Sequence, residues 1–213
     1  MTASAEARLI QARELFYSDT DGALRLYRDL VRTLPIGHEW AAAHIDLAMY
    51  EYGVANFETA VSLTREVIDA GDAIEKDGRA IAGILLCQTL EMLDREIDEI
   101  QLSHWVDDAL ATGHTLNAAV GTAILGDVAL KHDEAKGRAL LERSIELHND
   151  AGSMNGGPSI LQRLAKLDIK QGKTADARLK LERALERLKG FPLGGTSVRV
   201  LESRIKAQLD GLP

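Results

Sequence analysis

Apolar residues recur every three or four positions through two adjoining runs in residues 158–190. The first run holds Ile160, Leu161, Leu164, Leu167 and Ile169, and the second holds Ala177, Leu181, Ala184, Leu185 and Leu188. This spacing places each set on one face of an α-helix, and Gln171-Gly172-Lys173 between them predicts a tight turn. A helix pair this short cannot bury both apolar faces against itself, so it needs neighbouring pairs of the same kind.

The same pattern extends upstream as four more helix pairs. The predicted helices cover residues 2–17 and 23–34, 40–52 and 57–70, 79–93 and about 95–112, and about 116–130 and 133–148. A last helix, about residues 196–210, follows the fifth pair, and no strand pattern separates these helices. We therefore predict an all-α solenoid of about five helix pairs with a C-terminal capping helix, forming one domain over residues 1–213.

Two recurring features support a repeat. Ala23, Ala60 and Ala177 each lie shortly after a predicted turn, where a small side chain lets two helix backbones approach closely. Each is followed four positions later by a larger residue. Between pairs, helices end on Gly71, Gly113, Gly152 and Gly190, which are 42, 39 and 38 residues apart. A glycine is favoured there because the residue after a helix often adopts a left-handed conformation.

Two stretches share one arrangement of residues. A Leu-Ala pair in the first helix is followed by a turn residue and then by an alanine in the second helix. Two further residues lie four and seven positions after that alanine. These are Leu47, Ala48, Asn56, Ala60, Thr64 and Val67 in one stretch and Leu164, Ala165, Gly172, Ala177, Leu181 and Ala184 in the other. The arrangement resembles tetratricopeptide repeats (TPRs), with a period near 40 residues in place of the usual 34 or so.

The longer period is similar to a variant found in sensor regions of large bacterial transcriptional activators, where such arrays bind ligands or proteins. The resemblance covers roughly residues 1–190. It implies a right-handed solenoid whose first helices line a concave groove. By repeat position, the groove is expected to include Arg8, Ala12, Ile45, Met49, Tyr52, Gln162, Lys166 and Lys170.

Composition suits a helical protein of the cytoplasm. Apolar residues make up 46% of the chain but aromatic residues only 4%, so the core must consist mainly of Leu, Ile, Val and Ala. The one cysteine, Cys87, excludes an intramolecular disulfide and stands in an apolar run, where we expect a buried, unreactive thiol. The N-terminus lacks the apolar core of a signal peptide, and no apolar run reaches the roughly 20 residues that span a bilayer.

Charge is unevenly distributed. From Pro158 onward there are 12 Lys and Arg against 6 Asp and Glu, whereas the preceding residues hold 13 against 27. This gradient fits solvated helix faces, and it also fits steering of a charged partner or self-association. The basic segment lacks interleaved aromatic residues and contains Glu182 and Glu186, so nucleic-acid binding is not expected.

Catalytic motifs are not apparent. The sequence has no phosphate-binding loop, no dinucleotide fingerprint and no His-Glu-x-x-His zinc pattern among its six histidines. Asp133 is best interpreted as a helix cap. Trp105 either fills a gap between helix pairs, with His104 on the surface, or anchors a ligand. No cofactor or metal is therefore expected.

We expect a non-enzymatic protein–protein interaction module, such as an adaptor, chaperone or regulator. Such a module binds a peptide or partner protein in the concave groove. The alternative is a sensor domain that binds a small ligand or peptide in the same groove.

Overall fold

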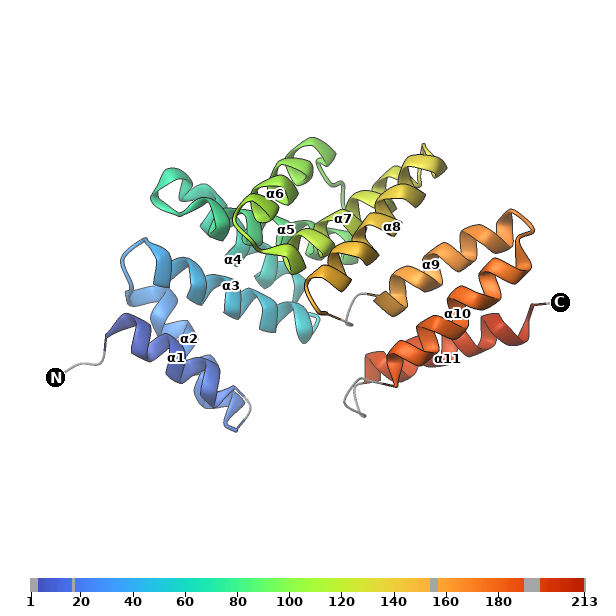
Figure 1. Ribbon diagram of the computed structural model, residues 1–213. Coiled ribbons are helices and arrows are strands. Elements are labelled where there is room, and N and C mark those ends of the chain that lie inside the picture. The colour runs from blue at the N-terminus through green and yellow to red at the C-terminus, as the bar shows by residue number, and fades with distance from the viewer. Residues whose placement is uncertain (1–3, 17, 154–156, 190–195, 213) are drawn as a thin grey trace. The chain divides into compact units, whose positions relative to one another are not determined.

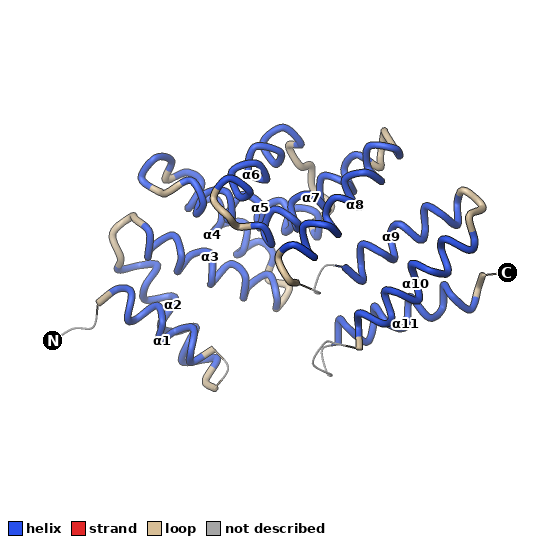
Figure 2. The backbone as a smooth tube through the Cα atoms, viewed as in Figure 1, coloured by secondary structure: helices blue, strands red, loops and turns tan. Residues whose placement is uncertain are grey.

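The computed structural model describes residues 4–16, 18–153, 157–189 and 196–212. These residues form eleven α-helices and no strand, which confirms the all-α prediction (Figures 1 and 2). The helices are α1 (Ala5–Leu15), α2 (Thr20–Thr33), α3 (His38–Gly53), α4 (Phe57–Asp69), α5 (Lys76–Met92), α6 (Glu99–Ala111), α7 (Thr115–Ala129), α8 (Glu134–Asp150), α9 (Gly157–Lys170), α10 (Thr174–Leu188) and α11 (Thr196–Asp210). A short 3₁₀ helix, η1 (Gly71–Ala73), follows α4.

Side-chain caps set two helix starts that apolar spacing misplaces. Helix α2 begins at Thr20, not at residue 23, because the Asp19 carboxylate accepts a hydrogen bond from the Gly22 N–H at 2.9 Å. Helix α6 begins at Glu99, not near residue 95, because the Asp98 carboxylate caps its first turn. A capping oxygen satisfies an N–H group that has no partner inside the helix, so it decides where the helix begins.

The chain divides into two compact units, Met1–Asn117 and Ala118–Pro213, which are described separately. In the first unit, α2 packs on α3 and α4 packs on α5, while the first helices of successive pairs also touch, α1 with α3 and α3 with α5. In the second unit, α8 contacts α9, α9 contacts α10, and α11 covers α10 (Figure 1). The expected single domain over the whole chain stays a prediction.

Small residues bring the two helices of a pair together. Ala23, Ala60 and Ala177 are fully buried, as their position after the turn predicts. The structure also gives the register of the fourth pair, where Gly137 takes this position four residues after Asp133. A Cβ on Gly137 would lie 2.8 Å from the backbone nitrogen of Leu130. The helices of this pair therefore approach too closely for any side chain larger than hydrogen.

One turn places an alanine in a backbone conformation that favours glycine. The junction glycines Gly71, Gly113 and Gly152 all have positive φ, as expected, while Gly190 lies outside the described residues. Inside the fifth pair Gly172 has φ +73°, and at the same turn position of the second pair Ala55 has φ +63°. An L-residue in the left-handed region places its Cβ against the following carbonyl, at a cost of about 1–2 kcal/mol.

The left-handed conformation shared by Ala55 and Gly172 predicts opposite effects for two reciprocal substitutions. Ala55→Gly should stabilise the protein by about 0.5–1 kcal/mol, because relief of the strain exceeds the extra entropy of glycine in the unfolded chain. Gly172→Ala should destabilise it by a similar amount. Urea denaturation of both variants measures the two effects. Destabilisation by Ala55→Gly would show that the left-handed turn carries no strain at this position.

A buried histidine in the second unit has a ring nitrogen without a hydrogen-bond partner in the described structure. His148 at the end of α8 is 2% exposed, and its Nδ1 has no hydrogen-bond partner within the described structure. Leu188 occupies the equivalent position of the fifth pair. Burial lowers the pKa of His148, and the positive charge of Arg187 lowers it further. The imidazole is therefore neutral in the folded protein at neutral pH.

This environment predicts a pH-dependent stability. Because the pKa of His148 is lower in the folded than in the unfolded state (about 6.5), the unfolded chain binds a proton more readily as pH falls below that value. The wild type should thus lose stability between about pH 7 and about pH 5, and His148→Leu should lose less. At neutral pH this variant should gain about 1 kcal/mol, because it removes an unsatisfied buried polar group. Thermal melts at both pH values test this, with the exposed His104→Leu as control. Equal pH dependence in wild type and His148→Leu would contradict it.

Candidate functional site

The first unit contains a groove lined mainly by the first helices of its pairs. One hollow, of about 590 Å³, lies along α1 and α3, and we call it the α1–α3 hollow. The other, of about 380 Å³, extends over α3, the start of α5 and the start of α7, and we call it the α3–α5 hollow. Arg13, Asp46 and Met49 line both hollows, so together they form one groove.

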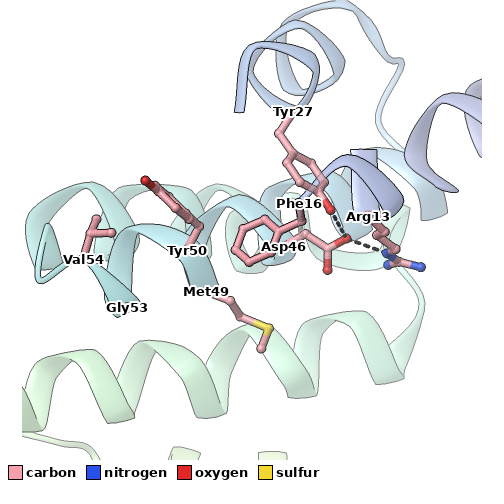
Figure 3. Close-up of a pocket in the computed structure, with 8 residues that line it drawn as sticks. All are labelled: Arg13, Phe16, Tyr27, Asp46, Met49, Tyr50, Gly53 and Val54. Carbon is pink, nitrogen blue, oxygen red and sulfur yellow. Dashed lines mark hydrogen bonds and ion pairs between the residues drawn. The ribbon is translucent and has the colours of Figure 1, made fainter. Parts of the chain in front are cut away.

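A hydrogen-bonded polar group stands where the two hollows meet. The Asp46 carboxylate accepts a hydrogen bond from Arg13 Nε at 2.7 Å and another from the Tyr27 hydroxyl at 3.3 Å (Figure 3). The hydrogen bond to Asp46 raises the pKa of Arg13, and burial, followed by the charge of Asp46, raises the pKa of Tyr27. At neutral pH the guanidinium of Arg13 is therefore charged and the phenol of Tyr27 is neutral. These bonds link α1, α2 and α3 at the centre of the groove.

Apolar side chains are exposed in the α1–α3 hollow. Met49 is 56% exposed and Val54 is 53% exposed. Phe16 meets Tyr50 edge to face, with the ring centroids 5.8 Å apart. Figure 3 shows these side chains, from α3 and the end of α1, to one side of the Arg13–Asp46 pair. This half of the groove therefore offers apolar surface beside a single ion pair.

The α3–α5 hollow is lined by carboxylates and by apolar side chains, which include Ala41, Ile45, Ile81 and Leu116. His38 Nδ1 lies 3.3 Å from Glu75 Oε2, and His114 Nε2 lies 3.2 Å from Asp77 Oδ2. Burial raises the pKa of Asp77, but hydrogen bonds from the Gly78 N–H and from His114 outweigh it, so the pKa is lowered. Asp77 is therefore ionised at neutral pH.

Two of the predicted groove residues line this groove. Ile45 lines the α3–α5 hollow and Met49 lines both hollows. On α1, Ala12 is fully buried in the core, and the next residue, Arg13, lines the groove in its place. One residue rotates a side chain by about 100° around a helix, enough to move it from groove to core. Arg8 forms an ion pair with Asp29 on α2.

Other predicted residues lie elsewhere. Tyr52 is partly buried against Phe57, with ring centroids 5.7 Å apart. In the second unit, Gln162 is 7% exposed and donates a hydrogen bond to Gln208 of α11 at 2.8 Å. Lys166 is exposed, and Lys170 Nζ lies 2.7 Å from Glu134 on α8. Whether these residues contact a partner stays a prediction.

Two further sequence interpretations are confirmed and a third is corrected. Trp105 is expected between helix pairs, but it packs over Gly83 of α5, within its own pair, while His104 is exposed as expected. Cys87 is 2% exposed, and burial raises the pKa of its thiol to about 12. Asp133 caps α8 by accepting a hydrogen bond from the Lys136 N–H at 2.9 Å.

Across the described ranges, no group of three or more His, Cys, Asp or Glu side chains is placed to hold a metal ion. None of the described helices has both the length and the hydropathy needed to cross a membrane.

Comparison with known proteins supports the repeat interpretation. No protein-family model matches the chain, and neither does any curated protein sequence. Among solved structures, PilF of Pseudomonas aeruginosa matches with a TM-score of 0.61 and 18% identity over 97% of this chain and 90% of that one. The TPR-like repeats of a putative kinesin light chain of Podospora anserina match with a TM-score of 0.57 and 15% identity, over 95% and 96%.

The chain has a TPR-like fold. MamA of Desulfovibrio magneticus RS-1 is a third structural match, with a TM-score of 0.56 and 13% identity over 89% of this chain and 97% of that one. At these identities the likeness is one of fold, and it agrees with the paired helices and small contact residues of this TPR-like chain. The closer similarity to sensor regions of transcriptional activators stays a prediction.

The contact between Trp105 and Gly83 predicts a stability effect. A methyl group on Gly83 would overlap the indole ring, so Gly83→Ala should destabilise the protein by about 1–3 kcal/mol. Gly53→Ala is the matched control, because nothing lies within 4 Å of a Cβ there, and it should change stability by less than about 1 kcal/mol. Urea denaturation compares the two. Similar effects at both positions would mean that Trp105 does not pack tightly on α5.

Proposed function

We propose that this TPR-like protein is a non-enzymatic interaction module that binds a peptide or a segment of a partner protein in the groove of its first unit. The observation that supports this most directly is the exposure of Met49 and Val54, with Leu116 at 41%, inside a groove formed by successive first helices. Apolar anchors flanked by polar groups are typical of grooves that bind peptides. An adaptor, a chaperone or a regulator would each use such a site.

The energetics favour binding without large rearrangement. Burying a Met, Val or Leu side chain from water contributes about 1.5–3 kcal/mol, and part of that remains available at these three half-exposed positions. The Arg13–Asp46–Tyr27 group links three helices, so the groove is already formed before a partner arrives. A preformed site avoids the free-energy cost of ordering on binding.

A small-ligand sensor is the second candidate. The α3–α5 hollow has a volume of about 380 Å³, within the range of about 300–1,000 Å³ that is common for small-molecule sites. Its lining combines apolar side chains with polar groups from α3, α5 and the turn before α7. A thermal-shift screen with metabolites tests this candidate, since a ligand that binds only the folded state raises the melting temperature in a saturable way.

The proposed function predicts unequal effects for two matched methionine substitutions. Met49 lines the groove, whereas Met92, at the end of α5, does not, and their exposures of 56% and 54% are nearly the same. Peptides selected from a random 12-residue display library on the full chain should bind Met49→Glu at least about tenfold more weakly. Met92→Glu should change their affinity by less than about twofold. Both variants should keep the wild-type circular dichroism spectrum.

Two outcomes of this experiment would contradict the proposal. One is a selection in which Met92→Glu weakens binding as much as Met49→Glu. The other is a set of peptides whose affinity neither substitution changes, because they would bind outside the groove. Fluorescence polarisation with labelled peptides provides the affinities in both cases.

A further inference from the structure

We infer that the segment bound in the groove is cationic as well as apolar, with a lysine or arginine placed at Glu75 and Asp77. This inference rests on the function proposed above and specifies the chemistry of the partner. The apolar side chains of the segment would occupy the α1–α3 hollow. Its positive charge would lie at the start of α5, in the α3–α5 hollow.

The start of α5 separates its charges between two faces. Glu75 and Asp77 line the groove, whereas Lys76 and Arg79 line a different hollow, beside α6. Lys76 Nζ lies 2.8 Å from Asp108 on α6, and Arg79 forms an ion pair of 3.0 Å with Asp72. The nearest basic side chains in the sequence are therefore held on the opposite side of α5, paired with other carboxylates.

The groove carboxylates thus lack a permanent cationic partner among the described residues. The side-chain contacts that the structure shows for Glu75 and Asp77 are to His38 and His114, and neither carboxylate forms an ion pair with a described lysine or arginine. Arg13 is the one Lys or Arg among the described residues that line this hollow, and it is bonded to Asp46. A positive charge on the partner would be attracted to Glu75 and Asp77.

Apolar surface adjoins these carboxylates, which distinguishes the site from an ordinary charged helix start. Ile45, Ile81 and Leu116 line the same hollow, and Leu116 is 41% exposed. Asp77 itself is 28% exposed, so its charge is partly shielded from water and acts on a bound group more strongly than a fully solvated one would. The groove therefore matches a segment in which lysine or arginine adjoins aliphatic residues.

The net charge of the whole first unit also favours a positively charged partner. Residues 1–117 contain 21 Asp and Glu against 9 Lys and Arg, a net charge of −12. A field of this sign attracts positively charged partners and raises their association rate at low ionic strength. Local contacts and the long-range field therefore favour the same class of partner.

The test uses the Met49-dependent peptides from the random library, with the full chain as the target. They should carry more Lys and Arg than the unselected library. Their dissociation constant should rise about tenfold, or about 1.4 kcal/mol, in the double variant Glu75→Gln with Asp77→Asn. The control, Asp72→Asn with Asp108→Asn, removes two charges from the other side of α5 and should change affinity by less than about twofold. Raising the salt concentration should weaken the wild type more than the groove variant.

Each contrary result has its own meaning. Met49-dependent peptides without an excess of Lys or Arg, or with equal affinity for the wild type and the groove variant, would overturn the cationic partner while the groove remains a binding site. Absence of any Met49-dependent peptide would overturn both proposals. Sedimentation of the unliganded chain completes the test. An oligomer that dissociates in the groove variant would mean that the occupant is a second copy, and the separate partner would be overturned.

Discussion

Within each unit, a helix pair depends on its neighbours to cover its second apolar face. The second and fifth pairs close around a small contact residue, Ala60 and Ala177, and their remaining apolar surface packs on adjoining helices. In the first unit, this requirement places α1 against α3 and α3 against α5. The groove follows from the same requirement, because first helices that lie side by side present one face to the outside.

The polar group at the centre of the groove also connects three helices. Asp46 accepts hydrogen bonds from Arg13 and Tyr27, so one carboxylate connects α3 to both helices of the preceding pair. The bond stabilises the stack and leaves an ion pair among exposed apolar side chains. The same residues that hold the repeats together therefore also define the surface that a partner meets.

Buried polar groups occur at related repeat positions. Asp168, which is 1% exposed, is paired with Arg138 at 2.8 Å and Lys180 at 2.6 Å. Glu51 holds the equivalent position of the second pair, is 5% exposed and accepts a hydrogen bond from Asn56 at 2.8 Å. A buried carboxylate is tolerated when its charge is paired and hydrogen-bonded. These two carboxylates meet that condition, while the buried Nδ1 of His148 does not.

The sequence by itself determined the helix pairs, the register of the first, second and fifth pairs and the absence of a recognisable catalytic motif. Those features depend on the spacing of apolar residues, on turn residues and on small residues, all of which can be identified from the local sequence. Helix starts set by caps, at Thr20 and Glu99, were misplaced because apolar periodicity does not show which carboxylate bonds to the backbone.

Only the tertiary structure decided which side chains share the groove. Ile45 and Met49 were predicted, but Ala12 was expected where Arg13 stands, since a shift of one residue leaves the apolar period almost unchanged and rotates the side chain by about 100°. The position of Glu75 and Asp77 on one side of α5, with Lys76 and Arg79 on the other, depends on how α5 packs between α3 and α6. Packing against neighbouring helices fixes the rotation of a helix about its axis. The spacing of apolar residues along the chain does not determine that rotation by itself.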